Sequence, residues 1–171
     1  FVPYGILVVV FAAAIVHLIY GNREWEEFSR PYSRLAWMIL GVGIATGDMW
    51  SYEVWEGYWI WDPAFTSILM TWILFTAYLH GTTMYRRGKM ALLTPALAVN
   101  SFIFALYSTY IIRSGSIQSA HVFGEGAQTM PLLVYVILFS VVSEGLVLYR
   151  YFTWKQEKEE KKTGILSTRN T

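Results

Sequence analysis

Five apolar runs divide this chain, and polar stretches separate them. At a rise of about 1.5 Å per residue, about 20 residues cross a hydrocarbon core about 30 Å thick, so the second run must lie near upright or extend into Arg34. Lipid offers no partner to backbone polar groups, so each run is predicted to be a helix. The chain is therefore expected to be an all-α integral membrane protein, a bundle of five transmembrane helices. The runs are Pro3 to Tyr20, Leu35 to Trp50, Phe65 to Tyr85, Met90 to Ile112 and Met130 to Phe152.

Composition agrees with this class, since 55% of the residues are hydrophobic and only 15% are charged. Of the 13 Lys and Arg, all except Arg113 follow the first or third run or lie at or beyond the end of the fifth. The positive-inside rule then places the N-terminus outside and the C-terminus in the cytoplasm. We predict a transmembrane domain over residues 1–152 with external loops at 51–64 and 113–129, and a charged cytoplasmic tail at 153–171. The expected location is the plasma (inner) membrane, with multiple spans in the lipid bilayer and no nucleic-acid partner.

Tryptophans concentrate in the first external loop, which reads WEGYWIWDP from Trp55 to Pro63. Trp and Tyr gather at the headgroup level of any bilayer, because their rings are apolar and their N–H or O–H tips are polar. Such a belt requires neither the WxxxWxW spacing nor the Asp-Pro pair that closes the segment. We interpret the segment as a flat aromatic surface on the outward side, suited to a flat apolar ligand such as a porphyrin.

The chain has three histidines, and their positions suggest iron ligation. His121 lies in the second external loop, on the same side as the tryptophans. His17 and His80 lie late in the first and third runs, both roughly 5 to 10 Å from the cytoplasmic boundary. Two imidazoles at one depth can ligate one heme iron from opposite faces. The alternative for each is a neutral histidine that is hydrogen-bonded inside the bundle.

Two motifs resemble a known family. WEGYWIWDP resembles the tryptophan-rich WWD signature of the heme-handling proteins of cytochrome c biogenesis, a family that includes CcmF, CcmC and CcsA. RSGSIQSAHVF, which begins at Arg113, resembles the outward segment that follows this signature in CcmF. The resemblance runs from about Tyr4 to Phe123 and is closest to a CcmF-like heme lyase subunit, split or truncated. Because the chain starts at Phe1 rather than Met, we expect it to be a piece of a longer protein.

The resemblance implies a role in cytochrome c maturation. In that role the chain would hold heme and present it for covalent attachment to apocytochrome c, as a component of a heme lyase that works with a heme chaperone and other maturation subunits. The chain has no cysteine, so the thiols would come from the apocytochrome. The implied residues are Trp55, Trp59, Trp61 and Asp62 as the heme platform, His121 as an outward ligand of that heme, and His80 as a ligand of a separate heme b in the membrane.

Three departures from the CcmF pattern leave alternatives open. Phe65 stands where CcmF usually has Glu, and Thr66 and Ser67 after it are more like CcmC. His17 has no counterpart in the family, so either it is the second heme b ligand, or another subunit supplies that ligand, or no heme b is bound. The alternative functions are a CcmC-type transporter that passes heme to a chaperone, a b-type cytochrome that transfers electrons, and a non-catalytic assembly subunit. An outward histidine at position 121 favours the lyase over the b-type cytochrome.

Overall fold

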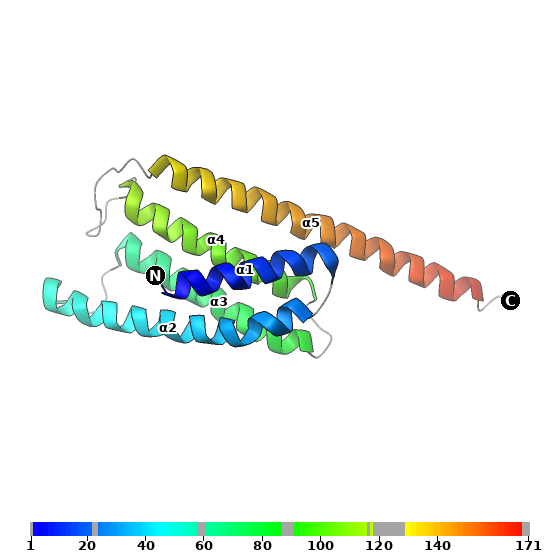
Figure 1. Cartoon of the computed structure of the whole chain (residues 1–171), viewed down its shortest axis with the longest axis horizontal. Helices are drawn as coiled ribbons and strands as arrows, with labels where there is room; N and C mark the ends of the chain where they lie inside the picture. Colours follow the sequence, from blue (N-terminus) through cyan, green and yellow to red (C-terminus); the bar gives the residue numbers. More distant parts are fainter. Residues whose placement is uncertain are drawn as a thin grey trace.

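The structure, a computed structural model, contains five α-helices and no strand within the residues it describes, which are 2–21, 24–57, 61–86, 91–115, 117 and 129–168. Of residues 85, 86 and 156–168 it describes the backbone alone. Figure 1 shows the helices lying roughly side by side. They are α1 (Val2–Tyr20), α2 (Glu24–Trp55), α3 (Pro63–Arg86), α4 (Leu93–Ser114) and α5 (Thr129–Thr168).

Helix α4 holds the bundle together, because it packs against α1, α3 and α5. Helix α2 packs against α1 and α3, while α5 packs against α4 and, less extensively, α1. In Figure 1, α5 continues past the end of the other helices. The end of α2 and the start of α3 lie at the same end of the bundle as the N-terminus. This common end is called the Trp-rich end below, and the opposite end, where α1 ends and α4 begins, is called the basic end.

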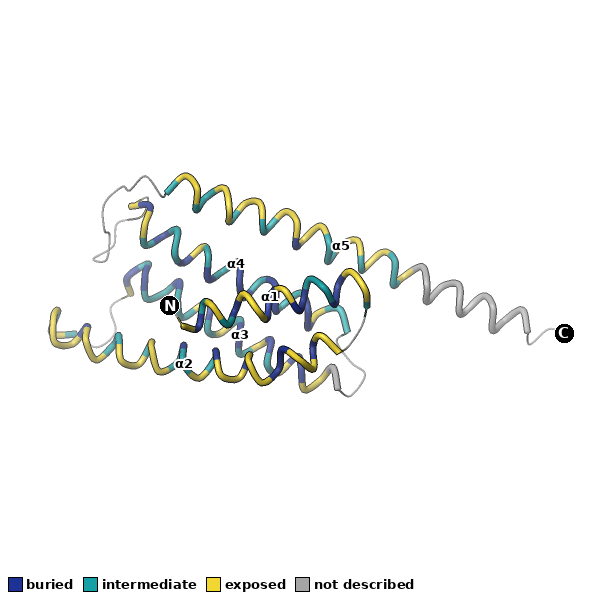
Figure 2. Tube along the Cα trace, in the orientation of Figure 1, coloured by how far each residue is buried: buried dark blue, intermediate teal, exposed yellow. Residues whose placement is uncertain are grey.

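The centre of the bundle is filled by aromatic and aliphatic side chains from α1, α3 and α4. Phe11 of α1 packs against Phe102 of α4 with ring centroids 4.6 Å apart, and Phe139 of α5 meets Phe11 edge-on at 5.5 Å. Phe75 and Tyr78 of α3 are fully buried beside them. Figure 2 shows that exposed residues follow the outer faces of the helices. Since many of these are large and apolar, the outer faces suit lipid better than water.

Helix α2 begins at Glu24, whereas the apolar run predicted a start at Leu35, which is too late. Its first turns are polar but buried. Glu26 and Arg30 form an ion pair at 2.8 Å, each with a side chain only 6% exposed. One turn further in, the hydroxyls of Ser29 and Ser33 each lie 3.3 Å from the Tyr78 hydroxyl of α3. These hydrogen-bonding groups attach the polar start of α2 to α3. Hydropathy along the sequence does not predict such contacts between helices.

Four of the described helices are long and apolar enough to cross a membrane: α1, α3, α4 and α5. The prediction of an all-α, multi-pass membrane protein is therefore confirmed. Helix α2 does not meet the same criterion of length and composition, since acidic and basic residues occupy its first turns and Asp48 and Glu53 lie near its other end. That α2 crosses the membrane, which makes five spans, and that the N-terminus is outside both stay predictions.

Candidate functional site

The Trp-rich segment starts inside a helix. Helix α2 continues through Trp55, past the predicted loop start at residue 51, and the chain then turns at Glu56, whose φ of 55° lies in the left-handed region. The hydroxyl of Ser51 donates a hydrogen bond of 3.1 Å to the carbonyl of Gly57 and so closes this turn. Trp55 is thereby held on the last turn of α2.

The described indoles do not form a single plane. Trp50 and Trp55 meet edge to face, with centroids 5.1 Å apart and an interplanar angle of 89°. Trp61 is 75% exposed, so a ligand can reach most of its ring. Trp59 lies outside the described residues. A platform that combines these indoles stays a prediction.

Asp62 has a structural role that the sequence interpretation did not include. It is buried, and its carboxylate accepts a hydrogen bond of 2.9 Å from the backbone N–H of Ala64, while its carbonyl accepts one from the N–H of Thr66. With Pro63 as the first residue of α3, this is the arrangement of an N-cap followed by proline. Asp62 therefore fixes the start of α3 directly beside the exposed Trp61.

An apolar cavity of about 420 Å³ lies near the Trp-rich end, between α1, α2 and α3. Its lining includes Tyr4 of α1, Gly43 and Gly47 of α2, and Phe65 of α3. Sequence reasoning missed this cavity, although the Gly43-x-x-x-Gly47 spacing gave a signal, since glycines one turn apart remove side-chain volume from one helix face. Phe65, the residue that departs from the CcmF pattern, is part of this wall.

His80 lies on the outer face of α3, in an exposed stripe with Met70, Ile73 and Met84. Its Nδ1 lies 2.9 Å from the carbonyl oxygen of Thr76, one turn earlier. A carbonyl oxygen only accepts hydrogen bonds, so Nδ1 carries the proton in the neutral ring and Nε2 keeps its lone pair. A backbone carbonyl on the second ring nitrogen is the usual support of a metal-ligating histidine. The geometry of His80 therefore suits iron ligation through Nε2.

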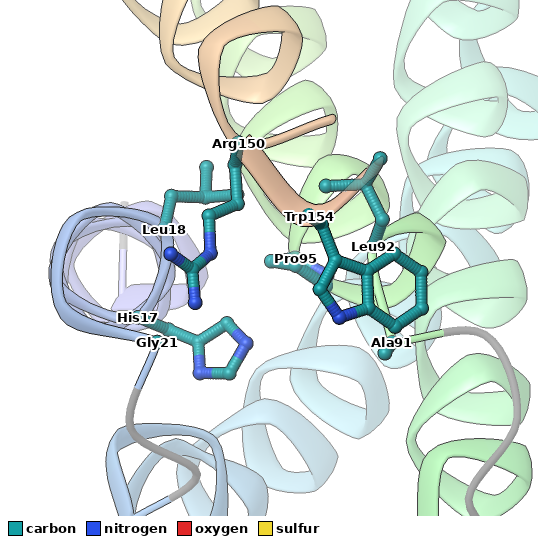
Figure 3. A pocket seen from close by; sticks show the side chains of 8 residues that line it. All are labelled: His17, Leu18, Gly21, Ala91, Leu92, Pro95, Arg150 and Trp154. Atoms are coloured by element: carbon teal, nitrogen blue, oxygen red, sulfur yellow. The ribbon is translucent and has the colours of Figure 1, made fainter. Parts of the chain in front are cut away.

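His17 lies in different surroundings. It is only 7% exposed and lines a cavity of about 90 Å³ at the basic end (Figure 3). The other lining residues belong to α1, to the start of α4 and to α5, where Arg150 and Trp154 face the same space. His80, on the outer face of α3, does not line this cavity. The described cavities thus do not bring the two histidines together, although the sequence predicted them at a similar depth.

Two further polar residues are His121 and Glu144. His121 lies outside the described residues, so its geometry stays a prediction. Glu144 of α5 accepts a hydrogen bond of 2.8 Å from the side-chain amide of Asn100 of α4. This contact links α4 and α5.

These features define a class: an all-helical, multi-pass membrane protein with an aromatic turn at one end of the bundle and histidines on separate helix faces. The sequence profile of the family described as "Cytochrome C assembly protein" matches residues 1–121. The chain therefore belongs to the cytochrome c assembly protein family.

Curated relatives agree with this assignment. The chain is 36% identical over 148 residues to the cytochrome c-type biogenesis protein CcmF of Haemophilus influenzae, a match that covers 84% of this chain and 23% of that protein. It is 33% identical over 147 residues to CcmF of Escherichia coli K12, covering 82% and 22%. It is also 33% identical over 154 residues to the cytochrome c-type biogenesis protein ccl1 of Rhodobacter capsulatus, covering 87% and 23%. The chain thus spans less than a quarter of the length of these relatives. No solved structure matches it.

Proposed function

We propose that this chain handles heme during cytochrome c maturation, as the CcmF-like part of a heme lyase. It would hold one heme at the Trp-rich end for attachment to apocytochrome c and a second heme, heme b, within the membrane. The N-terminus and the Trp-rich end would face outward, and the basic end would face the cytoplasm. A heme chaperone and other maturation subunits are the expected partners.

The observation that carries the heme b assignment is the hydrogen bond from Nδ1 of His80 to the Thr76 carbonyl. It fixes the ring and leaves Nε2 directed away from α3's own backbone, which is what an axial heme ligand requires. Because His80 belongs to an exposed stripe, a porphyrin would lie against the outside of α3. Met70, Ile73 and Met84 of that stripe are apolar and suit the porphyrin's faces.

The position of His80 also bears on the source of a second axial ligand. His17 faces the cavity bounded by α1, α4 and α5, and that cavity does not include His80. We therefore propose that the second ligand of heme b comes from a helix outside the described bundle, and not from His17. Two neutral imidazoles would then give a low-spin iron, and the loss of one would leave a five-coordinate, high-spin iron.

For the outward heme, the support is the exposure of Trp61 next to the fixed start of α3. The indole would stack on the porphyrin, and His121 with a further outward histidine would ligate the iron. Holding the vinyl edge of the heme where the apocytochrome thiols can reach it supplies proximity and orientation, which account for much of the rate of such a reaction. Release of the heme to a chaperone instead would make the chain a CcmC-type transporter.

The deciding experiment is a pyridine hemochrome assay with an optical spectrum on the purified chain, for the wild type, His80→Ala and His121→Ala. We expect His80→Ala to lose the membrane heme and keep any outward heme, and His121→Ala to do the reverse. His17→Ala is the matched control, expected to keep both. Equal heme content in the wild type and in His80→Ala would contradict the heme b assignment.

The platform has a separate test in cells, with a reporter cytochrome c. Trp61→Ala should lower maturation, because loss of a stacked indole costs about 0.5 to 1.5 kcal/mol, or roughly two- to twelvefold in heme occupancy. Trp25→Ala is the control, since Trp25 is also exposed but lies at the basic end on α2. Normal cytochrome c maturation in a folded Trp61→Ala variant would contradict the assignment of Trp61 to the heme platform. Maturation without chaperone loading would favour the lyase over the transporter.

A further inference from the structure

The cavity of about 90 Å³ at the basic end brings polar side chains from α1 and α5 together beside the start of α4. Figure 3 shows the guanidinium of Arg150 and the indole of Trp154, one turn apart on α5, around the same opening as the imidazole of His17 on α1. Arginine and tryptophan side chains carry donors and no acceptor. None of the described residues that line the cavity is acidic. This lining selects for an anion.

The start of α4 adds to this preference. Leu92 and Pro95 belong to the cavity lining, so the first turn of α4 borders the space. The N-terminus of a helix carries a partial positive charge, and its first N–H groups have no partner within the helix. Leu92, the N-cap residue, gives α4 no side-chain cap. The helix end and the guanidinium therefore favour the same charge from two sides.

The cavity lies at the ends of three membrane-spanning segments. It is bordered by the last turn of α1, which ends at Tyr20, and by the first turn of α4, which begins at Leu93. The apolar part of α5 ends at Lys155, directly after Trp154. Lipid phosphates are found at this level of a bilayer, and both Trp and Arg are common there because their polar tips reach the headgroups.

From these observations we propose that the cavity lined by His17, Arg150 and Trp154 binds a phosphate group. Arg150 supplies the charge-assisted hydrogen bonds and Trp154 a neutral N–H, while the imidazole of His17 closes the side toward α1. The volume is several times the roughly 15 Å³ that one water needs, so a phosphate fits. The phosphodiester of an anionic lipid and inorganic phosphate share this chemistry, and the test separates them.

Gly21 is part of the arrangement. Its φ of 71° lies in the left-handed region, and a Cβ at this position would overlap the guanidinium of Arg150. A side chain at residue 21 would therefore displace the guanidinium of Arg150 from its present position over the end of α1. The competing explanation is that Arg150 serves only to cap the last carbonyls of α1, as basic side chains often do at helix ends.

The experiment measures phosphate binding to the purified 171-residue chain in a phosphate-free maltoside detergent. Native mass spectrometry and melting temperature report binding of dihexanoyl phosphatidylglycerol, dihexanoyl phosphatidylcholine and sodium phosphate in separate arms. The variants are Arg150→Gln, Trp154→Phe and, as the matched control, Lys155→Gln. Lys155 is exposed, carries the same charge and lies next to Trp154 without lining the cavity.

We expect phosphatidylglycerol to bind the wild type and Lys155→Gln equally, and Arg150→Gln about tenfold more weakly, as for the loss of a charge-assisted hydrogen bond. Trp154→Phe keeps an apolar ring, should fold, and should bind about threefold more weakly. The same pattern with sodium phosphate alone would support the site with a soluble ligand. Equal weakening in Lys155→Gln, or unchanged binding in Arg150→Gln and Trp154→Phe, would overturn the proposal. The proposal would also be overturned by a different result. In that result Arg150→Gln has a lower melting temperature than the wild type, while phosphate does not change the melting temperature of the wild type.

Discussion

Asp62 shows how one capping side chain can fix the position of its neighbour in the chain. Its carboxylate accepts the N–H of Ala64 and so satisfies a donor that α3 leaves open at its start. The residue before it, Trp61, is 75% exposed, and the residue after it is a proline with a fixed φ. The direction in which the Trp61 indole leaves the bundle therefore depends on the cap. Under the proposed function, a change at Asp62 would act on heme binding through this geometry as well as through any direct contact.

Replacement of Asp62 should separate capping from ligand contact. Asp62→Ala removes the cap and should lower the free energy of unfolding by about 1 kcal/mol, whereas Asp62→Asn keeps a capping oxygen and should stay near the wild type. The measurement is unfolding in detergent by titration with dodecyl sulfate, followed by circular dichroism. If Asp62→Asn destabilises the chain as much as Asp62→Ala, the hydrogen bond to Ala64 is not what makes Asp62 stabilising.

At the scale of elements, α3 and α4 approach each other closely at Gly81. A Cβ at Gly81 would lie 3.2 Å from Oγ1 of Thr94 and 3.7 Å from its Cα, so backbone as well as side chain limits the space. Close backbone approach through small residues is a common means of helix association in membranes, where no hydrophobic force drives helices together. At Gly145 of α5, in contrast, a Cβ would meet no heavy atom within 4 Å among the described residues.

Gly81→Val should therefore destabilise the bundle by about 1 to 3 kcal/mol through overpacking against α4. Gly145→Val carries the same change in helix propensity at an open position and serves as the control. Thermal unfolding in detergent compares the two variants, and the cost at Gly81 beyond that at Gly145 measures the close contact. Equal melting temperatures would mean that α3 and α4 can separate at Gly81 without loss.

The helices themselves were predictable from the sequence, but their ends and faces were not. Apolar runs mark where a helix contacts lipid or core, and the runs around α1, α3, α4 and α5 fall within those helices almost completely. The start of α2 was missed because Glu26 and Arg30 pair with each other in a buried position. Hydropathy counts such residues as polar, and only the tertiary contacts show that they are shielded.

The same limit applies to the candidate site. Depth along a helix follows from residue spacing, and on that basis His17 and His80 were predicted at one level. The direction in which a side chain faces depends on how the helices pack. When a helix is apolar on all sides, the sequence pattern does not show which side faces the bundle. Packing turned His17 inward toward Arg150 and left His80 on the outside of α3. The aromatic turn was found because its residues are adjacent in the chain, whereas the cap at Asp62 depends on a backbone contact.

At the scale of the whole molecule, the arrangement leaves large apolar faces on the outside. On α2, a stripe of Leu35, Met38, Val42 and Met49 is exposed at helical spacing, each with 44% or more of its surface accessible. On α5, the described residues of the span are almost all exposed or half-buried. Patches of this size are expected to face lipid or another protein rather than water. For lipid to cover the exposed stripe of α2 as well as the exposed face of α5, α2 must lie across the membrane beside the other helices.

The last prediction is therefore that α2 crosses the membrane. Its 32 residues extend about 48 Å, more than the roughly 30 Å of a hydrocarbon core. The chain has no cysteine, so single-cysteine variants can be labelled without background. Glu27 and Glu56, both exposed, lie near the two ends of the helix. In spheroplasts, a membrane-impermeant maleimide should label Glu56→Cys directly and Glu27→Cys only after permeabilisation. Labelling of both from the same side would place α2 along the surface and leave four spans, whereas the reverse pattern would keep five spans and invert the orientation.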